Sequence, residues 1–252
     1  MIRGIYSAAS GMVTGLLRQE TISHNLSNME TVGYKQRVAI VRDFPSLLLA
    51  RLSGGGSAAG PGGPNVGALG TGVNVEDVVT DWSVGPLQQT DHLMDLALGS
   101  DGFFRVQTPD GVRYTRDGRF RRDSSSRIVS SDGYPLLGAD GPITLPDGDP
   151  FIAEDGTVTV GDTVVGKIDV ASFAQPDLLE RVGENLFSAP AGVESAPAPA
   201  RIMQGYLEQS NVDPTTAMLE MMNVARAYEA SQRMVQTQSS VLQKAVTEVG
   251  RV

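Results

Sequence analysis

The first stretch of the chain places apolar residues mainly three and four positions apart, up to about Asn28. This spacing puts side chains on one stripe of an α-helix. A polar run follows the stripe, and Gly33 then offers the left-handed conformation that ends a helix or turns a corner. The pattern predicts an amphipathic N-terminal helix, a turn, and an extended segment from Tyr34 to Ile40. The stripe consists of Ile5, Ala8, Met12, Leu16, Gln19, Ile22 and Leu26.

A second stripe occupies the end of the chain. Asp213 suits the N-cap of a helix, and Pro214 suits its first position, where the missing N–H costs nothing. The positions after Pro214 alternate by three and four as in an a/d heptad series, which predicts a helix of about 35 residues and about 50 Å. A small β domain could not cover such a stripe. Its members are Met218, Met221, Ala225, Tyr228, Gln232, Val235, Ser239, Leu242, Val246 and Val249.

The pattern changes between the two stripes. The segment "RDFPSLLLARL" predicts a short apolar helix or strand, and "SGGGSAAGPGGP" at residues 53–64 has only small side chains and proline, which indicates a flexible loop or linker. These glycines form no phosphate-binding loop, because no Gly-Lys-Ser/Thr follows them. Val75 also stands where a dinucleotide-binding motif needs its third glycine.

Seven Asp-Gly dipeptides punctuate short β-type runs between Asp101 and Gly156. Asp-Gly supplies the positive backbone angles of tight hairpin turns, so the region from Val73 to Leu186 is expected to form an antiparallel β domain, either a sandwich or an irregular barrel. The turn carboxylates fit no EF-hand spacing, which favours structural turns over calcium ligands.

Together these patterns predict an α+β fold. Long N- and C-terminal amphipathic helices would form an antiparallel, coiled-coil-like layer, with an antiparallel β domain in the central part of the chain. The expected divisions are an N-terminal helix at 1–35, a junction with a flexible loop at 36–72, the β domain with its return connection at 73–204, and the C-terminal helix at 205–252. Two helices leave much of each apolar face exposed, so a layer shared among several subunits fits better than an intramolecular hairpin packed on the β domain.

Composition narrows the possible functions. The chain has 252 residues, of which 40% are hydrophobic, and a net charge of −9, which argues against a general nucleic-acid binder. Residues 1–51 hold six basic residues against three acidic ones, which we interpret as solvated helix surface rather than a patch that binds a membrane or an acidic partner. Cysteine is absent, so disulfides, thiolate metal sites and a cysteine nucleophile are excluded. No cofactor or metal is expected.

The sequence also bears on export. Arg3, Thr14 and Arg18 interrupt what would have to be the apolar core of a cleavable signal peptide, and no stretch reaches the ~18 apolar residues of a membrane span. Any export would therefore use a route that does not read such a signal.

The sequence disfavours two other classes of function. An enzyme is disfavoured because His24 and His92 fall in different predicted regions and no hydrolase motif is present, although Asp91 and Asp95 are paired carboxylates. A monomeric cell-surface adhesin or peptidoglycan-binding module would need clustered aromatic residues, and only 6% of this chain is aromatic.

Several segments resemble one known family. The segments "AASGM", "ISHNLSNMETVGYK", "LQQTDHLMDLALGSDGFFRV", "YTRDGRF", "GYPLLG", "GYLEQSNVD" and "ARAYEASQRMVQTQSSVLQKAV" follow one another from the N-terminus to Val246. Together they resemble the bacterial flagellar basal-body rod and hook axial proteins, most of all their distal-rod type (FlgG- or FlgF-like).

The resemblance implies a structural subunit, not an enzyme. Members of this family polymerise through their terminal helices into a helical axial drive shaft that joins motor to hook, with the β domain outside. They contact other rod and hook axial proteins, and the flagellar type III apparatus exports them. The implied location is the basal body in the cell envelope, without nucleic acid or membrane insertion. The candidate assembly residues are Ile5, Met12, Leu16, Ile22, Asn25, Leu26, Asn28, Gly33, Tyr34, Met218, Met221, Ala225, Tyr228, Val235, Leu242 and Val246.

Overall fold

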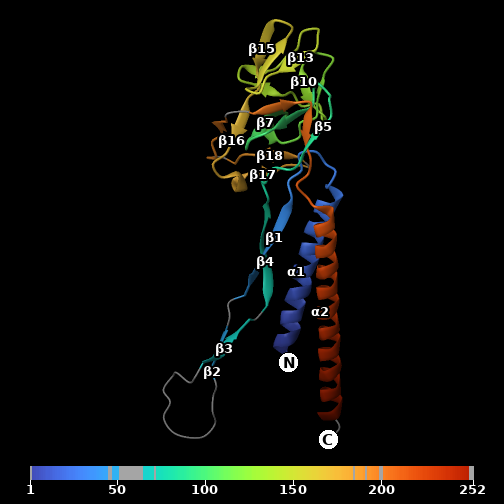
Figure 1. Cartoon of the computed structure of the whole chain (residues 1–252). Coiled ribbons are helices and arrows are strands. Elements are labelled where there is room, and N and C mark those ends of the chain that lie inside the picture. Colours follow the sequence, from blue (N-terminus) through green and yellow to red (C-terminus); the bar gives the residue numbers. More distant parts are fainter. Residues whose placement is uncertain are drawn as a thin grey trace. The chain divides into compact units, whose positions relative to one another are not determined.

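A computed structural model describes residues 2–44, 47–50, 65–70, 72–183, 185–190, 192–198 and 201–249 (Figure 1). The chain divides into two compact units. The helical unit comprises Met1–His24, Arg37–Val79 and Thr215–Val252, and the β unit comprises Asn25–Gln36 and Thr80–Pro214. The predicted flexible segment at 53–64 lies outside the described residues.

Two long helices, α1 (Ile2–Ser27) and α2 (Pro214–Val249), pack side by side in the helical unit (Figure 1). Their pairing is antiparallel, because Gly4 faces Gln238, Gly11 faces Ser231 and Gly15 faces Tyr228. A Cβ atom at Gly4 would lie only 2.4 Å from the Gln238 amide nitrogen. These glycines therefore let the two backbones approach closely. The predicted pair of terminal helices is confirmed.

The face of α2 that packs inward differs in part from the predicted stripe. Met221, Tyr228, Val235 and Leu242 are partly buried as the heptad series requires, and so is Ala225. Four other predicted positions, Met218, Gln232, Ser239 and Val246, are exposed, and the residue before each of them is covered instead. The physical reason is the space that the glycines of α1 leave open. Gly11 and Gly4 make room for the side chains of Ser231 and Gln238, whereas the heptad spacing had predicted the next residues along the chain. The covered positions are Ala217, Met221, Val224, Ala225, Tyr228, Ser231, Val235, Gln238, Leu242 and Ala245.

A β ribbon completes the helical unit. Strand β1 (Arg37–Asp43) pairs with β4 (Val73–Thr80), and β2 (Leu47–Ala50) pairs antiparallel with β3 (Asn65–Leu69). The apolar segment after Asp43, expected as a helix or a strand, is a strand where it is described. Ser10 and Thr14 of α1 tie the ribbon to the helix: the Ser10 hydroxyl accepts from the Val73 N–H and the Thr14 hydroxyl donates to the Val73 carbonyl, both at 3.3 Å.

The β unit consists of short strands joined by tight turns. Its largest sheet has six strands in the order β17-β18-β8-β7-β16-β19, β13-β14-β15 form a three-stranded sheet, and the other strands pair as β9 with β10, β11 with β12, β6 with β20 and β5 with β21. All of these pairings are antiparallel, as predicted. A short 3-10 helix, η1, spans Pro176–Leu178.

The strands of the β unit have these bounds: β5 (Leu87–Gln89), β6 (Leu96–Leu98), β7 (Phe103–Thr108), β8 (Gly111–Thr115), β9 (Phe120–Arg122), β10 (Ile128–Ser130), β11 (Leu137–Gly138), β12 (Gly141–Pro142), β13 (Pro150–Ile152), β14 (Thr157–Val160), β15 (Thr163–Lys167), β16 (Val170–Ser172), β17 (Glu180–Arg181), β18 (Leu186–Ser188), β19 (Ala196–Pro197), β20 (Ile202–Gln204) and β21 (Tyr206–Glu208).

Strand β7 separates two hydrophobic cores. Successive side chains of a strand point to opposite faces of its sheet, so Phe104 and Val106 enter a larger core while Phe103 enters a smaller, aromatic one. Trp82 packs edge-on against Phe103 and Phe187 in the smaller core. The centroid of its ring lies 5.4 Å from that of Phe103 and 4.9 Å from that of Phe187. The β unit thus has cores of its own, independent of the helical unit.

The Asp-Gly dipeptides act as turns, as the sequence predicted. Six of their seven glycines have positive φ angles, which Asp-Gly turns accommodate. Gly118 is the exception and has a different reason to be glycine: a Cβ there would lie 1.6 Å from the Leu96 carbonyl oxygen.

Candidate assembly site

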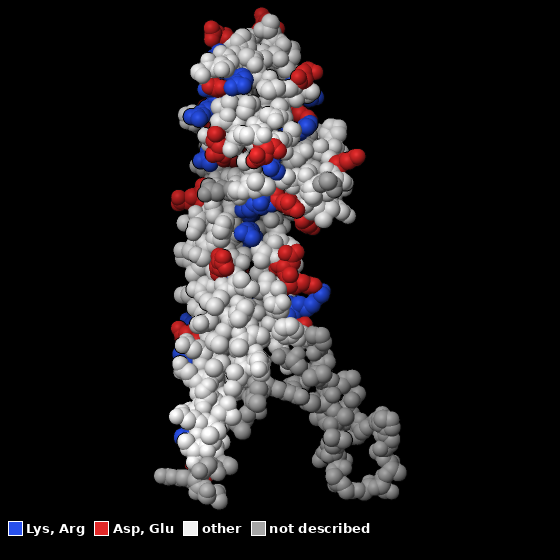
Figure 2. All heavy atoms as spheres, turned by 180° about the vertical axis from the view of Figure 1, so that it is seen from behind, with Lys and Arg blue, Asp and Glu red and all other residues white. Residues whose placement is uncertain are grey.

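Large apolar side chains remain exposed along both helices of the helical unit. On α1 they are Tyr6, Val13, Leu16 and Leu17, and on α2 they are Met218, Leu219, Met222, Met234, Val241 and Val246. Tyr6 is 70% exposed and Val246 is 72% exposed. On the face shown in Figure 2, charged side chains gather over the β-rich part of the molecule and are sparse over the described part of the helical end. Large contiguous patches of exposed apolar surface mark interaction sites in soluble proteins.

The structure divides the candidate assembly residues by burial. Leu16, Met218 and Val246 are exposed, whereas Ile22, Asn25, Gly33 and Tyr34 are buried within the chain. The remaining candidates are partly buried, namely Ile5, Met12, Leu26, Asn28, Met221, Ala225, Tyr228, Val235 and Leu242. The candidates therefore do not form one surface of the single chain, because only part of the set is exposed.

The turn after α1 is held by side chains of the predicted polar run. The Asn25 side chain is 2% exposed, and its amide oxygen accepts a hydrogen bond from the Tyr34 hydroxyl at 3.0 Å. The Asn28 amide oxygen accepts from the Thr31 hydroxyl at 3.2 Å. Gly33 has a φ of +71°, and a Cβ there would lie 2.5 Å from the Arg116 carbonyl carbon. Both backbone angle and space therefore require glycine at this corner.

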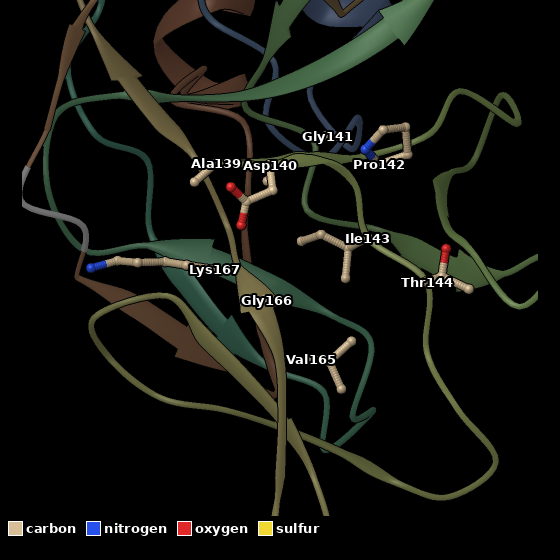
Figure 3. Close-up of a pocket in the computed structure, with 10 residues that line it drawn as sticks. Ala139, Asp140, Gly141, Pro142, Ile143, Thr144, Val165, Gly166 and Lys167 are labelled. Atoms are coloured by element: carbon tan, nitrogen blue, oxygen red, sulfur yellow. The ribbon is translucent and has the colours of Figure 1, made fainter.

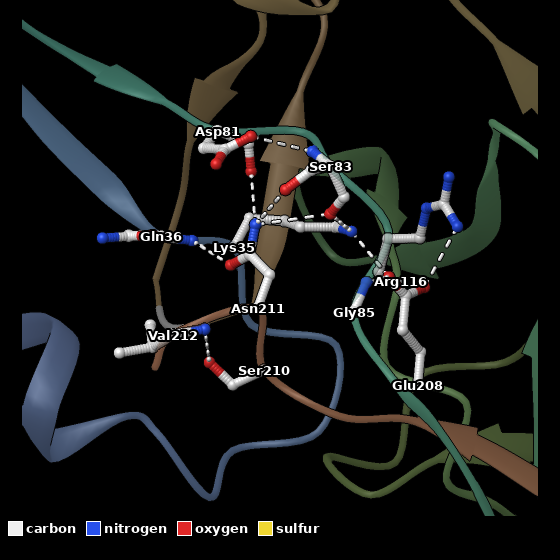
Figure 4. A network of polar contacts seen from close by, with 10 residues as sticks. All are labelled: Lys35, Gln36, Asp81, Ser83, Gly85, Arg116, Glu208, Ser210, Asn211 and Val212. Atoms are coloured by element: carbon white, nitrogen blue, oxygen red, sulfur yellow. Dashed lines mark hydrogen bonds and ion pairs between the residues drawn. The ribbon is translucent and has the colours of Figure 1, made fainter. Parts of the chain in front are cut away.

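A buried ionic network lies next to this corner, inside the β unit (Figure 4). The Lys35 ammonium donates to Glu208 at 2.6 Å and to the Ser83 carbonyl at 2.7 Å. Glu208 also accepts from Arg116 at 3.0 Å and from the Gly85 N–H at 2.9 Å. The side chains of Lys35, Arg116 and Glu208 are at most 3% exposed. The network joins residues that are up to 173 positions apart in the chain.

This network holds two buried cations against one buried carboxylate. Burial lowers the pKa of the Lys35 ammonium below the ordinary 10.5, and the nearby Arg116 guanidinium lowers it further, against the opposing effect of Glu208. Arg116 also lies over the Phe103 ring, 5.4 Å from its centroid. Glu208 is therefore the group on which the whole arrangement depends.

Further polar contacts fasten the segment around Lys35. Asn211 accepts from the Gln36 N–H at 2.7 Å and donates to the Asp81 carbonyl at 3.0 Å. Arg181 donates to the Lys35 carbonyl at 2.9 Å and lies over the Tyr34 ring, 4.7 Å from its centroid. The chain entering the β unit and the chain leaving it are thus bonded to each other and to the loop that follows Thr80.

Sequence reasoning did not identify this network. Lys35 and Glu208 do stand in two of the segments that carry the family resemblance, "ISHNLSNMETVGYK" and "GYLEQSNVD". Their place in these segments was the only sequence feature that singled them out. The spacing of residues along the chain could not show that Lys35 and Glu208 pair, because they are 173 residues apart.

One pocket of about 210 Å³ is lined by residues 138–144 and 165–167, with Ile143 and Val165 toward its interior and only Asp140 and Lys167 charged (Figure 3). No group of three or more His, Asp or Glu among the described residues is placed to hold a metal. The Asp91 carboxylate accepts a hydrogen bond from the Gln89 side chain, and the Asp95 carboxylate accepts one from the Thr90 hydroxyl. Both carboxylates are therefore bonded to residues close to them in the chain. No described helix is long and apolar enough to cross a membrane.

The fold and the exposed helical faces define a structural subunit with paired terminal helices and a central β unit. Three family models match the chain: "Flagella basal body rod protein" at residues 5–35, "Flagellar hook protein FlgE/F/G D1 domain" at 97–160, and "Flagellar basal body rod FlgEFG protein C-terminal" at 203–248. The chain belongs to the flagellar basal-body rod FlgE/F/G family, whose members are structural proteins and not enzymes.

Full-length relatives support this assignment. The chain is 34% identical to the flagellar basal-body rod protein FlgG of Bacillus subtilis, with 98% of both chains covered. It is 32% identical to the flagellar hook-basal body complex protein FlhO of the same organism over the full length of both, and 34% identical to FlgG of Borreliella burgdorferi, with 96% of this chain and 97% of the relative covered. The protein is a structural subunit of the flagellar basal-body rod.

Proposed function

We propose that this chain polymerises through its two terminal helices into the helical axial shaft of the rod, as a subunit of the FlgG type in the distal rod. The observation that carries the proposal is the set of large apolar side chains left uncovered on α1 and α2, because isolated amphipathic helices gain most of their stability from burying such faces. Neighbouring copies would bury them.

The proposed division of labour follows the expected domains. Residues 1–35 and 205–252 would provide the assembling part, 36–72 a junction, and 73–204 the β domain. The compact units divide the chain at nearby but different points, since Asn25–Gln36 belongs to the β unit and Arg37–Val79 to the helical unit. Membership in the family also supports contact with other rod and hook axial proteins and export by the flagellar type III apparatus.

A substitution on the exposed face of α2 tests the proposal. Met218 is 50% exposed in the single chain, so Met218→Asp should fold normally. In an assembly the same carboxylate would lose water without gaining a partner, a cost of several kcal/mol. We expect the purified variant to remain monomeric in analytical ultracentrifugation at concentrations where the unmodified chain forms long polymers.

Asn223→Asp is the matched control, because Asn223 is a polar, exposed residue of the same helix. It should polymerise almost like the unmodified chain, and circular dichroism should show equal β content in both variants. An unmodified chain that stays monomeric at all concentrations, or a Met218→Asp variant that polymerises normally, would contradict the proposal.

A further inference from the structure

A groove runs between α1 and the β1–β4 ribbon, inside the helical unit. It has a volume of about 480 Å³ and is lined by Leu17, Glu20, Thr21, His24, Arg37 and Val75–Val78. Leu17, Val75 and Val78 supply apolar surface, and Leu17 is 40% exposed. On α1 the groove extends from Leu17 to His24, about two helical turns or ~10 Å. It is of a size to receive the side of a helix.

The groove is acidic. Its lining includes three carboxylates, Glu20, Glu76 and Asp77, against the single guanidinium of Arg37. Arg42 pairs with Glu76. Within the described part of the chain, neither Glu20 nor Asp77 forms an ion pair. The groove therefore favours an occupant with apolar side chains and a positive charge.

The outward face of α2 from Met234 to Lys244 has that chemistry. Met234 and Val241 are seven residues apart, so they share one face of the helix, and they are 54% and 46% exposed. Lys244 follows Val241 by three residues and lies on the same face. Arg233 is paired with Glu229, and this stretch contains no acidic residue. Lys244 forms no ion pair among the residues that the structure describes.

This stretch of α2 cannot reach the groove of its own chain. Gly4 faces Gln238 and Gly15 faces Tyr228, so the part of α1 that lines the groove lies beside residues near 218–225 of α2. Val241 is some 16 to 23 residues further along, roughly 25–35 Å at 1.5 Å per residue. Only another copy of the chain can bring this face to the groove.

We infer that the groove between α1 and the β1–β4 ribbon receives the outward face of α2, Met234–Lys244, from a second copy of this chain. This inference rests on the proposed polymerisation and names one of its contacts. The groove and the α2 face are different surfaces, so the contact is heterologous: each copy offers both, and copies add head to tail without closing a dimer. Lys244 pairs with Glu20 or Asp77 in this arrangement, and Val241 packs against Leu17.

Cysteine cross-linking tests the inference directly, because the chain has no cysteine of its own. The full-length variant Thr21→Cys with Val241→Cys should form disulfide-linked ladders when oxidised under polymerising conditions. An in-chain disulfide is impossible at that separation, since bridged Cα atoms lie within ~7 Å of one another. Thr21→Cys with Ser239→Cys is the control, because Ser239 lies at the same level on the opposite, exposed side of α2.

Charge exchange provides the second measurement. Lys244→Glu should raise the critical concentration for polymerisation about fivefold, the order expected for an exposed ion pair turned repulsive. Adding Glu20→Lys and Asp77→Lys to Lys244→Glu should return it to within about twofold of the unmodified chain.

The outcomes separate this inference from the proposed function. If the chain polymerises and Met218→Asp blocks it, but Thr21→Cys with Val241→Cys gives no more ladder than the control, the groove assignment is overturned and the proposed function stands. The absence of rescue by charge exchange would also overturn it. If the unmodified chain does not polymerise, both fail.

Discussion

At the scale of single residues, Glu208 neutralises a site that would otherwise hold two unpaired buried cations. Replacing Glu208 by Gln keeps the shape but leaves Lys35 and Arg116 buried without a counter-charge. Replacing Lys35 by Met removes the surplus cation and leaves the pair of Arg116 and Glu208 intact. Breaking a buried pair by removing one partner costs about 3–5 kcal/mol, whereas removing an excess charge costs far less.

We therefore expect Glu208→Gln to lower the free energy of unfolding by about 3–5 kcal/mol and Lys35→Met to lower it by less than about 2 kcal/mol. Urea unfolding of the full chain, followed by Trp82 fluorescence in the β unit, measures both. If Glu208→Gln and Lys35→Met lowered the free energy of unfolding equally, the network would not contain a surplus of positive charge.

The same surplus charge fixes the sign of a pH dependence. The folded pKa of Lys35 lies below its unfolded value of 10.5, so between these two values the folded chain binds fewer protons than the unfolded chain. The free energy of unfolding then rises with pH across this window. Relative to Lys35→Met, the unmodified chain should gain stability as the pH rises from neutrality toward about 10. A relative loss over that range would mean that Glu208 holds the lysine pKa above its ordinary value instead.

At the scale of elements, the corner after α1 decides where the helix gives way to the β unit. Gly33 takes a left-handed backbone angle, its N–H donates to the Glu208 carbonyl at 2.7 Å, and Arg116 lies where a side chain would go. The backbone angle and the packing against Arg116 therefore both require glycine at position 33.

Gly33→Val should destabilise the β unit by at least about 2–3 kcal/mol, because the left-handed angle and the overlap with Arg116 both oppose a side chain. In cells we expect loss of motility. Gly183→Val is the control, since Gly183 also has a positive φ, of 81°, but has no atom within 4 Å of its Cβ position. Gly183→Val should lower the free energy of unfolding only by the strain of the left-handed backbone angle. An equal loss in both variants would show that the overlap with Arg116 does not contribute.

At the scale of the whole molecule, the two compact units should differ in stability when the chain is dilute. The β unit has two cores of its own, whereas the helices depend on faces that a single chain leaves exposed. Beyond about Leu242, α2 has no part of α1 beside it, because α1 begins at Ile2 and Gly4 faces Gln238. Fraying of α2 should therefore begin at its C-terminal end.

Limited proteolysis of dilute monomer should cut α2 first and spare Thr80–Pro214 together with Asn25–Gln36. The second segment should stay attached even when the chain between them is cut, because Lys35 and Gly33 bond to Glu208. Mass spectrometry of the resistant fragments tests this, and polymerised protein should resist along both helices. Monomer that resists equally along its whole length would contradict the expectation.

The sequence by itself determined the features that depend on near neighbours. Helical spacing set the two terminal helices, and the Asp-Gly dipeptides set the hairpin turns, because both signals act over a few residues. The segments that resemble rod and hook proteins also indicated the family to which the chain belongs.

Only the tertiary structure decided the features that join distant segments. The glycines of α1 selected which side of α2 packs inward, one residue from where hydrophobicity placed half of the stripe. Lys35 found its counter-charge 173 residues away, and the groove exists because α1 and the β1–β4 ribbon meet. Periodicity gives each element its apolar face, but which face is covered, and by what, depends on the shapes and charges that folding brings together.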